Sequence, residues 1–235
     1  MMNGLQRHGP DNGVLTLSLD RPQRLNALTL DLARALLQAV QQAQTDEAVR
    51  VILITAQGRA FCAGKDRDDP GTSEFVAVLQ QLAAGLMNSP KPVVAAVQGW
   101  AVGAGLELLL NCDIVLAARS ARFMLPEVHA GLFGTGGVLA LLPRKIGLAK
   151  AKGALMLGRE FSAQQADAWG LVWAVVADDA LAGETAAVAQ QLAGSDAKLL
   201  GEIKGLLHQE VVPDLPNVLA REAAVHKRLA ARATP

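Results

Sequence analysis

The chain has 235 residues, 51% hydrophobic and 19% charged, and its 22 Lys and Arg balance its 22 Asp and Glu. This composition predicts one folded domain with a sizeable core, excludes a disordered chain, and offers no basic excess for nucleic-acid binding. Two cysteines cannot supply a disulfide framework or a Cys-based zinc site, and without tyrosine no phenol can act as acid or nucleophile.

The N-terminus has no apolar stretch behind a basic start, so we expect no signal peptide. No apolar window reaches the ~20 residues that a bilayer span needs. We therefore expect a cytoplasmic protein with no membrane partner.

The first half of the chain alternates strands with helices. Period-two alternation over Val14–Leu19, closed by a turn, predicts a strand. Apolar residues at helical spacing predict a helix over 29–44 with Thr29 as its N-cap. The continuous apolar run Val51–Thr55 predicts a strand buried on both faces. A long loop rich in Gly, Asp and Arg and then a helix over 74–87 follow.

The next segments repeat this form, and the end of the chain is mostly helical. Expected in chain order are a strand at 92–97, a turn at 98–102, a helix at 103–110, strands at 113–117 and 122–125, helices after Gly134, a strand near 171–176 and a helical tail broken at 212–216. Strands alternating with helices predict an α/β sheet, and no linker separates two domains.

Several common cofactor motifs are missing. Two GxG patterns lack the third glycine of a dinucleotide site, because Leu108 and Leu139 occupy that position. The pair Gly64-Lys65 is followed by Asp66, which excludes a P-loop. The four histidines have no metal-ligand spacing. We therefore expect no metal and no redox or nucleotide cofactor.

Two glycine-bearing turns could bind a carbonyl oxygen. The first, 61–66, follows the buried strand, and the second, 98–105, opens a helix. Small side chains leave backbone N–H groups approachable, and a helix N-terminus adds unpaired donors. Two facing N–H groups would form an oxyanion hole that polarises a carbonyl. The alternative interpretation is that the glycines only permit tight turns and close helix packing.

Two glutamates could transfer protons. Glu107 lies on a helix that is apolar on nearly every side, so burial should raise its pKa. Glu127 follows Pro126 after a short strand. Paired carboxylates beside an oxyanion hole suit proton transfer next to a thioester carbonyl. Each also has a structural interpretation: Glu107 as a hydrogen-bonded buried carboxylate, and Glu127 as an acid favoured by the dipole of a helical turn.

Taken together, these segments resemble the crotonase (enoyl-CoA hydratase/isomerase) superfamily, in that family's order and spacing. The matching segments extend to about residue 176 and include 21–28, 61–66, 99–113, 123–127, 142–147, 152–158, 161–163 and 170–172.

The resemblance implies a spiral of ββα units with a helical C-terminal region. It implies a core over 1–195 and a tail over 196–235 that serves trimerisation and pocket cover. It further implies an acyl-CoA substrate, with coenzyme A as part of the substrate, and homotrimers that pair into hexamers.

The resemblance also assigns residues. Ala63 and Ala104 would donate the two oxyanion-hole amides, and Arg24 would lie near the phosphates of coenzyme A. The other expected substrate-binding residues are Ala27, Gly64, Lys65 and Asp66.

Glu107 and Glu127 match the acids with which hydratases of the family hold one water, add it across the 2,3-double bond and protonate the α-carbon. Retention of both acids favours an enoyl-CoA hydratase. One alternative is a Δ3,Δ2-enoyl-CoA isomerase that uses Glu127 only, and another is a family member that binds CoA thioesters without turnover.

Three features depart from the family pattern. The segment 131–137 is one residue shorter than the usual Pro-Gly-x-Gly-Gly turn, which alters the wall beside Glu127. His129 lies two residues past Glu127 and is interpreted as a packed or solvated side chain rather than a catalyst. The tail after the helix expected over 215–231 is shorter than usual, so we expect weaker coenzyme A binding or an altered oligomer.

Overall fold

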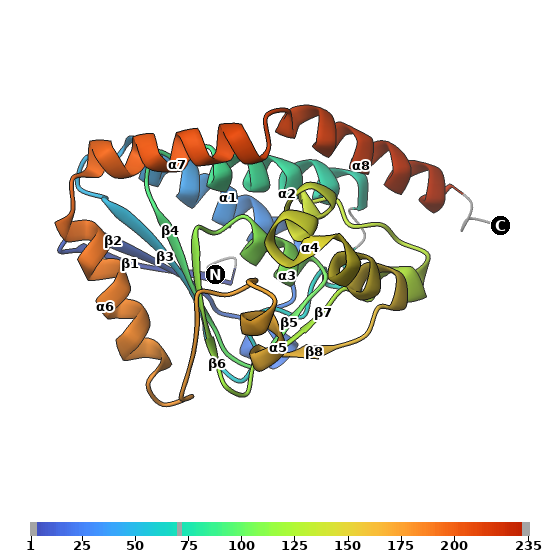
Figure 1. The fold of residues 1–235 in the computed structure, drawn as a ribbon, viewed down its shortest axis with the longest axis horizontal. Coiled ribbons are helices and arrows are strands. Elements are labelled where there is room, and N and C mark those ends of the chain that lie inside the picture. Colours follow the sequence, from blue (N-terminus) through green and yellow to red (C-terminus); the bar gives the residue numbers. More distant parts are fainter. Residues whose placement is uncertain (1–3, 70–71, 232–235) are drawn as a thin grey trace.

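The computed structural model describes residues 4–69 and 72–231, in which helices and strands alternate along most of the chain (Figure 1). The strands are β1 (Leu5–Asp11), β2 (Val14–Leu19), β3 (Val51–Ala56), β4 (Val93–Val97), β5 (Trp100–Val102), β6 (Ile114–Ala118), β7 (Arg122–Met124), β8 (Phe161–Ser162) and β9 (Ala174–Val176). The α-helices are α1 (Leu30–Thr45), α2 (Thr72–Met87), α3 (Ala104–Leu110), α4 (Val138–Leu157), α5 (Ala163–Ala168), α6 (Leu181–Gly194), α7 (Ala197–Val211) and α8 (Leu215–Ala230). Two 3-10 turns, η1 (Pro22–Arg24) and η2 (Glu127–Ala130), complete the set.

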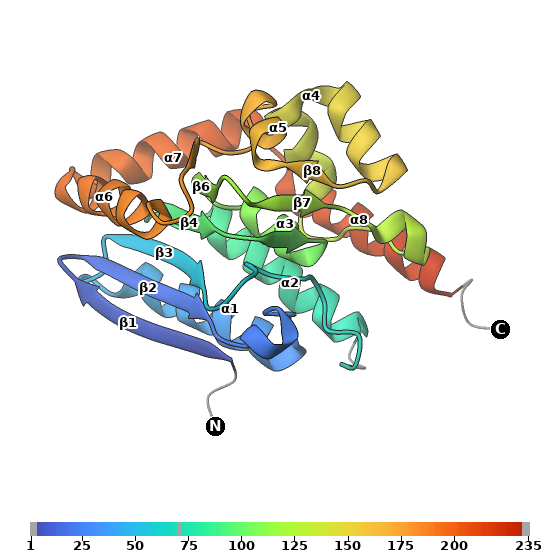
Figure 2. The same cartoon turned by 90° about the horizontal axis from the view of Figure 1, so that it is seen from below.

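A six-stranded sheet in the order β1-β2-β3-β4-β6-β9 organises the fold. β1 and β2 are antiparallel, and the other neighbours are parallel. Strand β3 shows why both faces need cover: Ile52 and Ile54 belong to one core cluster, whereas Val51 and Leu53 belong to another. Helices α1 and α2 cover the first face and α6 covers the second (Figures 1 and 2).

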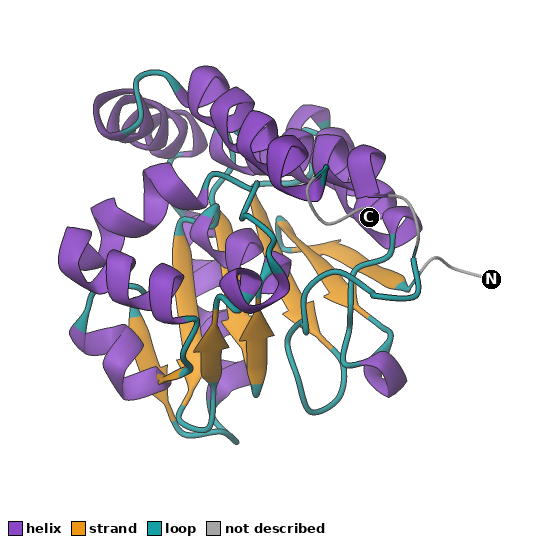
Figure 3. Ribbon diagram, turned by 90° about the vertical axis from the view of Figure 1, so that its right-hand side faces the viewer, coloured by secondary structure: helices purple, strands orange, loops and turns teal. Residues whose placement is uncertain are grey.

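A second, three-stranded sheet, β5-β7-β8, begins just after the carboxyl end of β4. Helices pack around the strands (Figure 3). This second sheet is joined to the loop after β3 by backbone hydrogen bonds, from Cys62 N to Trp100 O (2.9 Å) and from Val102 N to Cys62 O (2.9 Å). These bonds fix the loop at 61–66 against the start of α3.

The structure confirms the predicted α/β class and most of the predicted elements. Thr29 caps α1, since its Oγ1 accepts a hydrogen bond from Leu32 N (3.1 Å). The sequence did not predict β1 or β8, and the expected turn at 98–102 contains β5. Gly9 and Pro10 interrupt the alternation of β1, and β5 and β8 are too short to show a period. No helix in the described part of the chain is long and apolar enough to cross a membrane.

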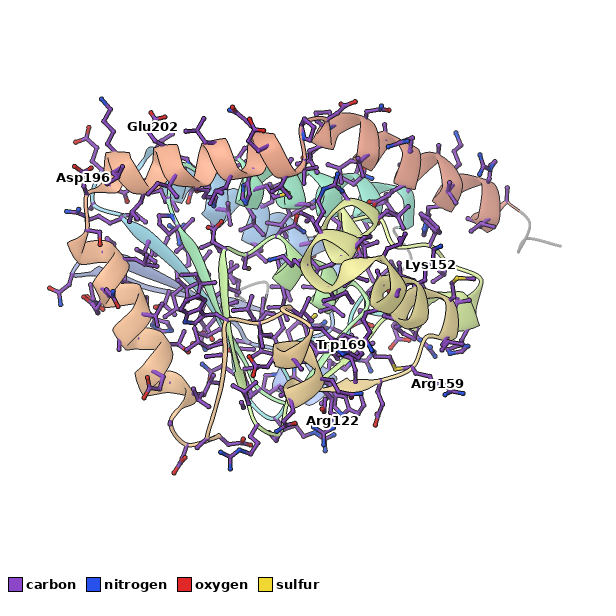
Figure 4. All side chains as sticks on the ribbon, viewed as in Figure 1. Arg122, Lys152, Arg159, Trp169, Asp196 and Glu202 are labelled. Atoms are coloured by element: carbon purple, nitrogen blue, oxygen red, sulfur yellow. The ribbon has the colours of Figure 1, made fainter. Side chains whose placement is uncertain are left out.

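Helix α7 is attached to the sheet by a buried ion pair. Lys204 Nζ lies 2.7 Å from Asp113 Oδ2 and also donates to the carbonyl oxygens of Leu86 (2.8 Å) and Lys91 (3.1 Å). Asp196, labelled in Figure 4 at the start of α7, caps the helix, and Glu202 points away from the sheet into solvent. Lys204 therefore determines which face of α7 packs inward.

Replacing Lys204 by Met should lower the free energy of unfolding by about 3 kcal/mol, because Asp113 would lose its buried cation. Urea unfolding monitored by circular dichroism measures the change. Lys198→Met, at an exposed position in the first turn of α7, is the control and should change stability by less than about 0.5 kcal/mol. Equal effects of the two substitutions would contradict the anchoring role.

Candidate active site

A cavity of about 450 Å³ lies between the loop after β3, the end of β5, the turn η2 and the helices α2, α3 and α8. Its apolar wall includes Phe75 and Leu79 of α2. Other lining residues, which contribute polar side chains or backbone amides, come from separate parts of the chain. They are Ala63, Gly64, Lys65, Asp66, Arg67, Ala104, Glu107, Glu127, His129, Thr135 and His226. The cavity thus collects residues that are up to about 160 positions apart in the sequence.

The two glycine-bearing turns come together at one edge of this cavity. Gly64 has a φ of +91°, and a Cβ placed on it would lie 2.9 Å from Val102 O and 3.7 Å from Ala104 N. Ala104 is the first residue of α3, so its N–H has no partner within that helix. A glycine at 64 is therefore required for the close approach of the two loops.

The amide of Ala63 differs from the sequence prediction, because its N–H donates to Leu25 O at 3.0 Å. The neighbouring carbonyl of Gly64 accepts from Leu28 N (2.7 Å), and Asp66 N donates to Leu28 O (2.8 Å). Between them, Lys65 N has no acceptor among the described residues. Within the described residues, the amides of Gly64 and Lys65 are thus free of acceptors, whereas that of Ala63 is already engaged.

Glu107 is 2% exposed, and its carboxyl group is enclosed by the segment before α4. Its Oε2 accepts hydrogen bonds from Gly136 N (2.5 Å) and Thr135 N (3.1 Å). Cβ atoms placed on Gly134 and Gly136 would lie 2.8 and 2.7 Å from the two carboxyl oxygens, so this approach requires glycines. Burial, reinforced by the negative charges of Glu127 and Glu222, raises the pKa of Glu107 to about 8.

Glu127 begins the 3-10 turn η2 and reaches the cavity from the opposite element. A Cβ on Gly103 would lie 2.7 Å from Glu127 Oε1, which places this carboxyl against the residue that precedes Ala104. Burial raises the pKa of Glu127 as well. The electrostatic effect of Glu127 on Glu107 and their common cavity show that the fold brings the two predicted acids together.

The remaining predicted residues lie around this centre. Arg24 and Arg21 form ion pairs with Asp66 (3.2 and 3.0 Å) at a second, more open cavity of about 540 Å³. Asp66 lines both cavities, whereas Ala27 lines neither. His129 lines the main cavity beside Gly158 at the end of α4.

The sequence analysis expected the tail to cover the pocket and the segment 131–137 to form a wall beside Glu127, but it did not identify the individual residues that these parts contribute. Thr135 and Gly136 supply the two amides that hold Glu107, and His226 of α8 lines the cavity. No local pattern distinguishes these residues from ordinary loop and helix positions. The described residues contain no group of three or more His, Cys, Asp or Glu side chains that could hold a metal ion.

Gly103→Ala should disturb both the backbone and Glu127. Gly103 has φ +52° and ψ −123°, a conformation that non-glycine residues rarely adopt, and the new methyl group would collide with Glu127 Oε1. We expect the free energy of unfolding, measured by urea titration, to fall by about 1–3 kcal/mol. Gly183→Ala in α6 meets open space and should be neutral or stabilising, and a similar loss there would contradict the explanation.

The buried carboxyl of Glu107 should make stability fall with rising pH. Its pKa rises from the ordinary 4.5 to about 8 on folding, so the folded state holds a proton that the unfolded chain releases. The contribution is complete below the unfolded pKa and is lost as pH increases through the folded value. Glu107→Gln should therefore gain stability over the unmodified protein between pH about 5 and about 8, as measured by urea unfolding. A pH-independent difference would contradict this.

The sequence matches the enoyl-CoA hydratase/isomerase family over residues 9–234. It is 38% identical over 232 residues to 1,2-epoxyphenylacetyl-CoA isomerase from Escherichia coli, covering 94% of this chain and 88% of that protein. It is 37% identical over 223 residues to 2,3-dehydroadipyl-CoA hydratase from the same organism, covering 93% and 87%. An enoyl-CoA hydratase structure from Mycobacterium avium subsp. paratuberculosis superposes with a TM-score of 0.93 at 32% identity, covering 99% of this chain and 95% of that one.

Proposed function

Since this chain belongs to the enoyl-CoA hydratase/isomerase family and is an enzyme of that family, we propose that it adds water reversibly to a trans-2-enoyl-CoA. The observation that carries the proposal is the pair of glutamates, buried Glu107 and half-buried Glu127, lining one cavity with the amides of Lys65 and Ala104, which have no acceptor among the described residues. An isomerisation needs one proton-shuttling acid, whereas hydration uses two.

The amides of Lys65 and Ala104 are proposed to bind the thioester carbonyl oxygen. Lys65 lies in a loop fixed by backbone hydrogen bonds and Ala104 lies at the start of α3, so the donors are oriented before the substrate binds. As negative charge develops on the carbonyl oxygen, these hydrogen bonds strengthen and stabilise the enolate-like state. Ala63 and Gly64 then act as small lining residues that let the thioester approach.

The two glutamates are proposed to share one proton and hold one water molecule. The ionised carboxyl takes a proton from water as the water oxygen bonds to C3, and the protonated carboxyl gives its proton to C2. The double-bond electrons pass to the thioester and return to form the new C–H bond, so the pair ends with one proton, as it began. Burial and mutual repulsion support a shared proton by raising the pKa of Glu107 to about 8.

We further propose that no metal or redox cofactor takes part, because the reaction transfers only protons and hydroxide. Coenzyme A enters as part of the substrate. The second cavity, with Arg21 and Arg24 at its rim, is the proposed place for its phosphates, although both guanidinium groups already pair with Asp66. Exchange of that pairing for phosphate contacts would accompany binding.

A homotrimer or a hexamer is the proposed assembly. Helix α7 supports it with exposed apolar side chains, namely Leu199, Ile203, Leu206 and Leu207. Sedimentation velocity would give the mass in solution. The mass of a single chain would contradict the proposal.

The hydratase proposal is tested by the loss of the conjugated enoyl-thioester absorbance. Crotonyl-CoA is the first substrate, followed by longer and aromatic 2-enoyl thioesters, with mass spectrometry detecting the gain of one water. Water addition to any of these supports the proposal. Failure with all of them, at enzyme concentrations that bind the thioester, would overturn it.

The second candidate is a Δ3,Δ2-enoyl-CoA isomerase in which Glu127 alone moves the proton. It is supported by the family, whose description includes isomerases as well as hydratases, and one relative that is 38% identical to this chain is a 1,2-epoxyphenylacetyl-CoA isomerase. In that case Glu107 would only shape the cavity. Conversion of a 3-enoyl-CoA to the conjugated thioester without hydration would favour this candidate.

A further inference from the structure

Helix α8 forms a set of polar contacts with the segment that holds Glu107. Its Glu222 is fully buried and accepts two hydrogen bonds, Oε2 from Gly137 N (2.8 Å) and Oε1 from Leu139 N (2.8 Å). Gly137 is the N-cap of α4, and Leu139 lies in its first turn. The carboxylate thus satisfies two otherwise unpaired donors at the positive end of that helix.

Two further contacts fix the same segment. His226 Nδ1 lies 3.0 Å from Phe133 O, four residues along α8 from Glu222. Gln80 of α2 donates from one nitrogen to Thr135 O (3.0 Å) and to Leu219 O (2.7 Å). The segment 133–139 is therefore bound by α8 at both of its ends and by α2 in the middle.

This segment in turn supplies the only amides seen to contact the Glu107 carboxyl within the described residues. Thr135 N and Gly136 N donate to Glu107 Oε2, and Gly137, the next residue, donates to Glu222. A break at Glu222 would release the peptide that immediately follows the Glu107 contact. Glu222 thus binds the residue next to the one that binds Glu107, although Glu222 and Glu107 are more than a hundred positions apart in the sequence.

We propose that Glu222 is a positioning residue for Glu107, acting through the amides of segment 133–139. This inference rests on the proposed function insofar as it concerns turnover. Glu222 is not among the residues that line the cavity, so its effect on the reaction passes through Glu107.

Because Glu222 is charged, its removal should change the pH dependence of the reaction, which a purely structural residue would not do. The negative groups acting on Glu107 are Glu127 from η2 and Glu222 from α8. The other titratable side chains of the cavity, which the variants leave unchanged, are Lys65, Asp66, Arg67, His129 and His226. Removing the charge of Glu222 makes ionisation of Glu107 easier, so the alkaline limb of the rate profile should move to lower pH.

The first test needs no substrate. Amide hydrogen exchange at Thr135 and Gly136, measured by NMR on the full chain, should accelerate about 10-fold or more in Glu222→Gln. Glu222→Asp retains the charge and should show a smaller change. The matched control is Glu184→Gln, an exposed carboxylate in the first turn of α6, with unaltered exchange at both amides. Unchanged exchange at Thr135 and Gly136 in a folded Glu222 variant would overturn the proposal.

The second test measures turnover of a 2-enoyl-CoA against pH. In Glu222→Gln, kcat should fall about 10-fold with KM changed less than about 2-fold, and the alkaline limb should move down by about half a pH unit or more. In Glu222→Asp the limb should stay in place. An unmoved limb in Glu222→Gln would overturn the positioning role.

If Glu222→Gln does not fold, Glu222→Asp replaces it as the test. Faster exchange and a lower kcat in Glu222→Asp would then support the positioning role, and unchanged values would overturn it. Absence of hydration by the unmodified protein would instead count against the proposed function, and the exchange test would still decide the contact.

Discussion

Glu127→Gln should reduce kcat for hydration by about 10²- to 10⁴-fold. The amide has the same shape as the carboxyl and fits against Gly103, but it can neither accept a proton from water nor return one to C2. Burial raises the pKa of Glu127, which favours proton transfer by this carboxyl. KM should change little, because the amides of Lys65 and Ala104 remain.

Loss of enoyl-thioester absorbance under saturating substrate gives kcat directly. The matched control is Glu160→Gln, an exposed carboxyl before β8, which should leave kcat and the free energy of unfolding unaltered. Retention of more than about a tenth of the activity by a folded Glu127→Gln protein would show that another group transfers the proton.

Glu107→Gln should abolish hydration to a similar extent, by about 10²- to 10⁴-fold. The side-chain oxygen can still accept from Thr135 N and Gly136 N, so the segment before α4 stays in place while proton transfer is lost. In the unmodified protein the rate should also fall on the alkaline side as the pair loses its shared proton, near the pKa of about 8 of Glu107.

This substitution separates the two candidate functions. A hydratase loses its reaction in Glu107→Gln, whereas an isomerase that depends on Glu127 keeps most of its activity on a 3-enoyl-CoA. Both reactions are followed at the absorbance of the conjugated thioester, with opposite sign. Undiminished hydration by the variant would remove Glu107 from the mechanism.

Much of the fold could be predicted because its signals are local. The alternation of β2 and the apolar run of β3 each reflect how a strand is buried, and Thr29 caps α1 through a contact within its own turn. The apolar helix around Glu107 predicted an acid with a raised pKa, and Glu127 was singled out as the second candidate acid. Their meeting in one cavity depends on how β6 and β7 return the chain, which spacing alone does not determine.

The differences between the predicted and the described site have a common physical origin in long-range backbone contacts. The prediction of Ala63 as an oxyanion donor did not include Leu25, which adopts a φ of +50° and turns its carbonyl toward the Ala63 amide. Leu25 and Asn26 (φ +54°) both adopt a left-handed conformation. Glycine usually marks this conformation in a sequence, and neither position is a glycine. The role of Glu222 was likewise invisible, since its partners lie more than 80 residues away.

In the proposed site, main-chain amides bind the carbonyl and side-chain carboxyls transfer the protons, and this has an evolutionary consequence. The groups proposed to polarise the thioester are amides, so replacement of the side chains at Lys65 or Ala104 leaves the donors themselves in place, provided that the new side chain fits. The acids come from separate elements, α3 and η2, and can be exchanged one at a time without rebuilding either loop. On the proposed mechanism, a substitution at position 107 or 127 therefore alters proton transfer while the amides that bind the thioester remain in place.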